Sequence, residues 1–237
     1  ALCALASTAA FTQAAVWQDF SLSALYGENY KAPFAAGNEK IDQSTITAEY
    51  AAGLKYGDIF AFADRTNNDF GNETYFEVAP RLSLGAVTGQ KLELGPIKDV
   101  LIATTWEGNS GASDFNNYLY GIGFALDIPY TSYANINFYK ADNDLQKDDY
   151  QMTITYAVPF KIGGEEFLAD AFLDWSTAEG PDHKSELNWT SQYKWNVGKH
   201  ISPETKLYLG IEHSVWNNKF GTDVDQHDVS ALVKYHF

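Results

Sequence analysis

Apolar and polar residues alternate along most of this chain, and the alternation is clearest at its end. In the final segment one face comprises Val229, Ala231, Val233, Tyr235 and Phe237, and the other comprises Asp228, Ser230, Lys234 and His236, with Leu232 the exception. A period of two residues predicts a β-strand. An apolar strand face that ends in Phe237 is typical of a closed transmembrane barrel, whose last strand pairs with the first and presents its apolar side to lipid.

Similar segments recur from Trp17 onward and predict twelve strands. Their approximate ranges are 17–27, 43–55, 58–65, 74–86, 92–106, 116–128, 132–140, 149–160, 165–176, 185–197, 204–216 and 227–237. This spacing accommodates transmembrane strands of about 9–11 residues and their connections. We therefore predict an all-β fold, a transmembrane antiparallel up-and-down β-barrel that forms one domain over residues 16–237. A soluble β-sandwich secreted to the periplasm stays an alternative, because its core also uses alternating faces.

The predicted connections alternate between short and long. The short ones, at 55–58, 87–90, 129–131, 161–164 and 198–203, all carry Gly or Pro. The long ones, at about 28–42, 66–73, 107–115, 141–148, 177–184 and 217–226, hold many of the acidic residues. Short periplasmic turns and long extracellular loops are the regular arrangement of bacterial outer-membrane barrels. We therefore expect both ends of the barrel domain on the periplasmic side and a negatively charged extracellular rim.

Composition narrows the class of protein. The sequence contains no run of about 18 apolar residues, so it predicts no membrane-spanning helix. Aromatic residues make up 15% of the chain, which fits either a rich core or two aromatic girdles at the membrane interfaces. The formal net charge of -15 argues against a nucleic-acid partner, whose phosphates require a basic face. We expect a lipid bilayer with lipopolysaccharide as the surroundings and the bacterial outer membrane as the location.

The first 15 residues are uncharged, small and apolar, and they include the only cysteine, Cys3. This composition predicts a residual secretory signal peptide over residues 1–15, with cleavage near Ala14 or Ala15. An ordinary N-terminal segment is the alternative. A single cysteine also excludes an intramolecular disulfide framework.

No catalytic or metal-binding motif appears in the sequence. The five histidines lack metal-ligand spacing such as H-E-x-x-H, and there is no G-x-S-x-G, phosphate loop or second cysteine. We therefore predict that the protein is not an enzyme and that it has no catalytic residues, no metal site and no cofactor.

The polar faces of the strands are the remaining candidates for function. They predict a lumen lined by Glu77, Arg81, Asp99, Asn135, Asn137, Tyr139, Asp170, Phe172, Asp174, Asn188, Gln192, Lys194, Tyr208, Glu212, Trp216, Asp228 and Lys234. Two inward groups combine rings with carboxylates: Asp170, Phe172 and Asp174 on one strand, and Tyr208, Glu212 and Trp216 on another. Aromatic planes stack on flat rings and carboxylates accept hydrogen bonds from hydroxyls, so these groups suit a ring-shaped polar solute. Packing inside the barrel is the alternative role.

Two further positions are interpreted from spacing alone. Glu77 and Arg81 share one face of a strand and pair with each other or with neighbouring strands, and a structural salt bridge is favoured over a solute contact. Phe60 and Phe62 share a face with Asp58 and Asp64, and we interpret both rings as facing lipid with the acids at the two rims. An orientation in which they line the lumen is the alternative.

Several blocks resemble one family of outer-membrane proteins. They are Phe62-Ala-Asp64, Tyr75-Phe-Glu-Val-Ala-Pro-Arg-Leu-Ser83, Leu94-Gly-Pro-Ile-Lys-Asp99, Tyr120-Gly-Ile-Gly-Phe124, Tyr156-Ala-Val-Pro-Phe160 and Val233-Lys-Tyr-His-Phe237. Together they resemble the nucleoside-specific channel-forming proteins of the Tsx family and the related OmpK-type barrels. The resemblance implies a monomeric twelve-stranded barrel with a narrow, keyhole-like pore for passive diffusion of nucleosides.

The resemblance also implies an aromatic contact for the base just after the first strand. Tyr30 is the best match and Phe34 the second, although the Phe-Gly pair typical of that segment is absent. This departure leaves room for an OmpK-like protein that acts as a surface or phage receptor, or as a general small-solute porin. A phage or bacteriocin bound at the extracellular loops is then the alternative partner.

Overall fold

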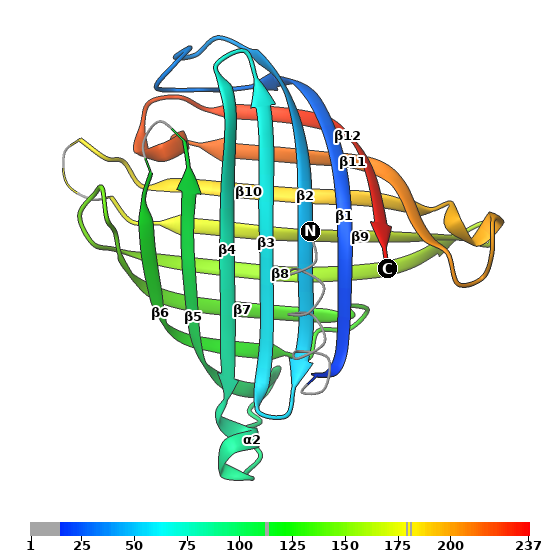
Figure 1. Ribbon diagram of the computed structural model, residues 1–237. Helices are drawn as coiled ribbons and strands as arrows, with labels where there is room; N and C mark the ends of the chain where they lie inside the picture. Colours follow the sequence, from blue (N-terminus) through cyan, green and yellow to red (C-terminus); the bar gives the residue numbers. More distant parts are fainter. Residues whose placement is uncertain (1–14, 112–113, 179, 181) are drawn as a thin grey trace, which may run out of the picture.

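The computed structural model describes residues 15–111, 114–178, 180 and 182–237, and it shows a closed antiparallel barrel of twelve strands (Figure 1). The strands are β1 (Ala15–Tyr30), β2 (Ile41–Leu54), β3 (Gly57–Asn68), β4 (Gly71–Ser83), β5 (Ile97–Ser110), β6 (Asn116–Leu126), β7 (Tyr133–Asp142), β8 (Asp149–Ile162), β9 (Glu165–Ser176), β10 (Glu186–Asn196), β11 (Lys206–Asn217) and β12 (Gln226–His236). Each strand pairs with its neighbours in sequence, and β1 closes the barrel against β12. The predicted twelve-stranded barrel is confirmed, and a single closed sheet replaces the two sheets of a sandwich.

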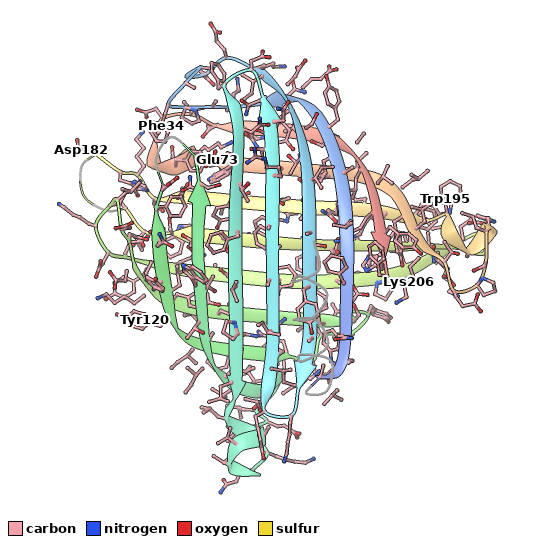
Figure 2. All side chains as sticks on the ribbon, viewed as in Figure 1. Phe34, Glu73, Tyr120, Asp182, Trp195 and Lys206 are labelled. Carbon is pink, nitrogen blue, oxygen red and sulfur yellow. The ribbon has the colours of Figure 1, made fainter. Side chains whose placement is uncertain are left out.

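The barrel has two different ends. We call the end with the connections β1–β2, β3–β4, β5–β6, β7–β8, β9–β10 and β11–β12 the loop end, and the opposite end, where β1 begins and β12 finishes, the turn end. Figure 2 shows Phe34, Glu73 and Asp182 near the loop end and Trp195 and Lys206 toward the turn end. Strands β1 to β4 cross the strands of the far wall steeply in Figure 1, as the strong tilt of a small barrel requires.

The connection between β4 and β5 differs from the prediction. A tight turn at 87–90 between strands ending at 86 and starting at 92 is wrong, because β4 ends at Ser83 and β5 begins at Ile97. Between them lies the short helix α2 (Leu84–Thr88), whose N-cap Ser83 accepts a hydrogen bond from Ala86 N and which ends at Gly89 with φ 69°. Serine at the N-cap and a left-handed glycine after the last turn are the usual helix boundaries. Two short 3₁₀ turns, η1 (Gly198–His200) and η2 (Lys219–Gly221), complete the elements.

The outer face of the barrel is apolar. Directly paired residues point to the same side of an antiparallel sheet, so the pairing of β11 with β12 places Ile211 and Ala231 together outside and Glu212 and Ser230 together inside. Large apolar side chains such as Ile122, Phe138 and Val233 are exposed on this outer face. Lipid covers such a band in a membrane barrel. No helix among the described residues is long and apolar enough to span a membrane.

One sector of the lumen is packed. Ala103, Leu119, Tyr139 and Ala141 form a buried apolar cluster inside the β5–β7 wall. Gly121 pairs with Tyr139 in this wall, and a side chain at Gly121 would collide with the backbone of β7.

The interpretation that Phe60 and Phe62 face lipid is wrong. Phe62 pairs with the inward Glu77, and its ring lies 5.7 Å from the ring of Tyr75, whose hydroxyl bonds to Glu77. The acids on the same face explain the orientation, because Asp58 accepts hydrogen bonds from Arg81 and Asp64 accepts one from Thr47. Charged groups of this kind need the polar interior, so they carry the two rings inward with them.

The predicted signal peptide at 1–15 lies outside the described residues except for Ala15, where β1 begins. Its cleavage near Ala14 or Ala15 stays a prediction.

Candidate functional site: the barrel lumen

In the turn-side half of the lumen, Arg81, Lys194 and Lys234 each form an ion pair with a carboxylate. Arg81 donates two parallel hydrogen bonds to Asp58, from Nε to Oδ1 at 2.8 Å and from Nη2 to Oδ2 at 2.7 Å. The Arg81 salt bridge predicted from sequence is therefore present, and its partner comes from the neighbouring strand β3 rather than from Glu77. Such a bidentate pair fixes the geometry of both side chains.

The two lysines are buried in the same way. The Nζ atom of Lys194 lies 2.6 Å from Asp170 Oδ2, and the Lys194 side chain is fully buried. Lys234 pairs with Glu49, which also accepts a hydrogen bond from Ser21. A buried charge of this kind requires its counterion, so the predicted solute contact Asp170 is committed to Lys194.

The carboxylates of the loop-side half are arranged differently. Among the described residues, no ion pair joins a lysine or arginine to Asp64, Glu77, Glu107, Asp174, Glu212 or Asp228. Their partners are neutral: Asp174 accepts from Thr153, and Glu212 accepts from Gln192 at 2.8 Å. Carboxylates without a bound cation keep lone pairs available for donors on a solute.

Tyr75 sits between two of these carboxylates. Its hydroxyl oxygen lies 2.6 Å from Glu77 Oε1 and 2.8 Å from Glu107 Oε2, and Asn117 donates to the other oxygen of Glu107 at 2.7 Å. A phenol has one proton, so it donates to only one carboxylate at a time. The pair therefore has more acceptor atoms than protein donors to fill them.

An aromatic column runs along β3 and β4 beside these acids. The ring centroids are 5.9 Å apart for Phe60 and Phe62, 5.7 Å for Phe62 and Tyr75, and 6.4 Å for Tyr75 and Phe115. These spacings lie within the range of favourable aromatic contacts. The aromatic column therefore runs without a break from Phe115 near the loop end to Phe60 toward the turn end.

A second aromatic group lies at the mouth of the loop end. The rings of Phe34 and Phe220 stack nearly in parallel, with centroids 6.0 Å apart and planes 15° apart. Trp216 meets Phe220 edge-on at 4.7 Å. We call Phe34, Trp216 and Phe220 the mouth stack. Phe34 is 79% exposed, so this stack faces the loops and the solvent outside.

Lys219 fastens the mouth stack to the barrel. Its Nζ atom donates to the carbonyl oxygen of Lys31 at 2.8 Å and to Gln226 Oε1 at 2.7 Å, and it lies 4.8 Å from the Trp216 ring. We call these bonds the Lys219 clasp, because they join the first loop to the last. Burial lowers the pKa of Lys219 to about 8.

The residues predicted to contact solute thus take several positions. Phe34 and Trp216 meet at the mouth, whereas Tyr30 is buried, with its hydroxyl 2.9 Å from Ser230 Oγ. Phe172 lies inward, because it pairs with Thr155 and Thr190. Tyr208 is directed away from the mouth, with its ring 5.5 Å from that of His236.

Sequence reasoning missed several rings. Phe60, Phe62 and Tyr75 carried a signal, because Asp64 and Glu77 fix the inward phase of β3 and β4. Phe115 and Phe220 carried none, because they lie in connections without a period. Among the described residues, no cluster of three or more His, Cys, Asp or Glu side chains could hold a metal ion.

Comparisons with known proteins agree with the predicted outer-membrane barrel. A family profile described as nucleoside-specific channel-forming protein, Tsx, matches residues 16–237. The outer membrane protein OmpK of Vibrio parahaemolyticus is 27% identical over 180 residues, which are 71% of this chain and 66% of that protein. The nucleoside-specific channel-forming protein Tsx of Klebsiella pneumoniae is 24% identical over 165 residues, which are 62% of this chain and 53% of that protein. These matches thus span only about half to two thirds of the length of the relatives.

Among solved structures, the KdgM porin in complex with disordered oligogalacturonate matches with a TM-score of 0.50. It is 10% identical, and the match covers 92% of this chain and 99% of that porin. At this identity the likeness concerns the fold alone.

Proposed function

The chain belongs to the family of nucleoside-specific channel-forming proteins, Tsx, and we propose that it passes nucleosides or similar small polar solutes by passive diffusion. It is an outer-membrane β-barrel of the kind found in Gram-negative bacteria. The observation that carries the proposal is the aromatic column of Phe60, Phe62, Tyr75 and Phe115 beside carboxylates that have no cationic partner. A nucleoside offers a flat base to the rings and sugar hydroxyls to the carboxylates.

In this proposal a nucleoside enters at the mouth stack and then moves along the aromatic column. The base exchanges one ring for the next, first Phe34 and Phe220 and then Phe115, Tyr75 and Phe62. Each sugar hydroxyl donates to a carboxylate near the ring that holds the base. Several weak sites in series serve transport better than one strong site, because the solute has to leave again.

The sign of the lumenal charge selects among related solutes. Among the described residues, no lysine or arginine forms an ion pair with Glu77, Glu107 or Asp174, so this region of the lumen holds more acidic than basic groups. A phosphate group on the solute would meet that excess directly. The proposal therefore favours uncharged nucleosides over nucleotides.

A single chain is sufficient for this path. The barrel closes between β1 and β12 of the same chain, and that chain supplies both the aromatic column and the mouth stack. We therefore propose that the monomer is the functional unit.

The test is single-channel conductance of the refolded protein in a planar bilayer, titrated with adenosine, thymidine and a hexose. We expect saturable block by the two nucleosides and none by the hexose. Conductance without nucleoside block would assign another solute to the channel. A folded barrel without conductance would overturn transport and favour the surface-receptor alternative.

A further inference from the structure

Glu186 begins β10 at the loop end and contacts two members of the mouth stack. Its Oε2 atom accepts one hydrogen bond from Trp216 Nε1 at 2.8 Å and another from the backbone N of Phe220, also at 2.8 Å. One oxygen thus holds the indole of β11 and the backbone of η2 together.

The backbone of Phe220 needs such an external restraint. Phe220 has φ 56° and ψ 36°, and its neighbours Asn218 and Gly221 have φ 51° and 69°. Positive φ is costly for a phenylalanine, and residues persist in it only where the surroundings impose it. The β9–β10 connection restrains the backbone conformation around Phe220. Asn218 Nδ2 donates to the Ser185 carbonyl oxygen at 2.8 Å, and Lys184 N donates to the Gly221 carbonyl oxygen at 2.9 Å.

This restraint sets the direction of the Phe220 ring. With its backbone held by Glu186, the ring packs edge-on against Trp216 and lies nearly parallel to Phe34. Without Glu186, the N–H groups of Trp216 and Phe220 lose their acceptor, and the left-handed conformation of Phe220 loses one of its restraints. The ring opposite Phe34 is then held less firmly.

We propose that Glu186 is a positioning residue for the mouth stack, and that its carboxylate oxygen sets the affinity of the channel entrance for planar solutes by fixing Trp216 and Phe220. The inference rests on the proposed function for its solute but not for its geometry. The proposal attributes the effect of Glu186 on solute affinity to its acceptor oxygen and not to its negative charge. Glutamine at this position keeps one carbonyl oxygen able to accept both bonds.

The test compares Glu186→Ala with Glu186→Gln in adenosine-titrated bilayer recordings. Loss of an ordered aromatic contact corresponds to a five- to tenfold change, so we expect Glu186→Ala to raise the half-blocking adenosine concentration about five- to tenfold. Glu186→Gln is expected to stay within about threefold of the wild type. The unblocked conductance is expected to change less than about twofold in both variants.

Asp149→Asn is the matched control. Asp149 is a buried carboxylate at the start of β8, also at the loop end, and its hydrogen-bond partner is Asn143 rather than a ring of the mouth stack. We expect the half-blocking concentration of Asp149→Asn to equal that of the wild type. Equal losses in Glu186→Gln and Glu186→Ala would overturn the proposal, because charge and not the acceptor would then set the affinity. An unchanged Glu186→Ala variant would also overturn it.

Fluorescence separates this inference from the proposed function. The difference between the spectra of the wild type and Trp216→Phe isolates the emission of Trp216. We expect this component to shift to longer wavelength in the Glu186→Ala background and to stay in place in Glu186→Gln. If adenosine fails to block the wild type but the shift occurs, the nucleoside assignment is wrong and the positioning role stands. If adenosine blocks and no shift occurs, the positioning role is wrong.

Both outcomes require folded protein, which heat-modifiable gel migration reports. If Glu186→Ala does not fold, Trp216→Phe removes one of the two donors while Glu186 stays in place. We then expect a two- to threefold rise in the half-blocking adenosine concentration, and an unaltered concentration would overturn the proposal.

Discussion

In the turn-side half of the lumen, Arg81, Lys194 and Lys234 each hold a carboxylate in an ion pair, whereas in the loop-side half the hydrogen-bond partners of Glu77 and Asp174 among the described residues are neutral side chains. The two regions contain the same types of residue on the same alternating strands. They differ in whether the charges are matched within the protein. Matched charges leave little bonding capacity for a solute, and unmatched ones leave much.

This difference separates structural from functional polarity. A buried ion pair contributes to the barrel mainly in the sense that the loss of one partner is costly. An unmatched carboxylate beside the aromatic column adds repulsion within the folded barrel, and such destabilising groups concentrate at functional sites. We therefore expect substitutions in the turn-side half to affect stability and those in the loop-side half to affect solute selection.

The largest expected effect is on stability. Asp170→Ala leaves the fully buried Lys194 without its counterion, so we expect a loss of about 3 kcal/mol in the free energy of unfolding. Urea unfolding of the refolded barrel in lipid vesicles measures it. The double variant Asp170→Leu with Lys194→Met is expected to recover most of the loss. An Asp170→Ala barrel as stable as the wild type would remove the distinction between the two halves.

The next effect is on solute affinity. Phe62→Ala interrupts the aromatic column between Phe60 and Tyr75, and loss of a base–aromatic stack costs about 1–3 kcal/mol. We expect the half-blocking adenosine concentration to rise about tenfold in bilayer recordings. Phe138→Ala is the control, because Phe138 is an exposed phenylalanine on the outer face. Similar losses in both variants would show that the column has no special role.

A smaller effect is expected on charge selectivity. Glu77→Gln removes one of the acidic groups of the loop-side lumen, so the preference of the channel for cations over anions should fall. The measurement is the reversal potential in a tenfold KCl gradient, which we expect to move toward zero. Glu204→Gln makes the same charge change in the exposed β10–β11 connection, where Glu204 accepts from Ser202. It should leave the reversal potential unchanged, and equal shifts would place the selectivity outside the lumen.

The smallest effect is the pH dependence of the mouth. The pKa of Lys219 is lowered by burial to about 8 in the Lys219 clasp, while an exposed lysine titrates near 10.4. Between these values an opened mouth binds a proton that the clasped mouth does not, so raising the pH favours the clasped state. We expect conductance fluctuations to become rarer from pH 7 to pH 9.5. The trend should be absent in Lys219→Met, and its persistence there would assign it to another group.

The sequence predicts the strands and their inward faces well, for a physical reason. Charged residues such as Glu212 and Lys234 cannot face lipid, so they fix the phase of each strand and with it every neighbouring side chain. Phe60 was misassigned because its ring is apolar, and only Asp58 and Asp64 on the same face reveal that it points inward. The face of a strand on which a residue lies is a local property, so the alternation of polar and apolar residues in the sequence reveals it.

The bonding partner of an inward side chain lies on another strand, and the alternation within one strand does not reveal it. The sequence places Asp170 and Asp174 on one inward face, but it does not show that Asp170 meets Lys194 whereas Asp174 meets Thr153. That outcome depends on the register of β9 with β8 and β10. The left-handed Phe220 is equally hidden, because its conformation is imposed by Glu186 from another strand.

The most direct test of this comparison uses two solutes that differ by one phosphate. Adenosine and adenosine 5′-monophosphate are added separately to the loop side of wild-type channels in a planar bilayer, and the half-blocking concentration of each is measured. The same base with an added negative charge meets the unmatched carboxylates Glu77, Glu107 and Asp174. We predict saturable block by adenosine and at least tenfold weaker block by the nucleotide, with the gap narrowed in Glu77→Gln. Equal block by both solutes would contradict the account, because the loop-side carboxylates would then take no part in selection.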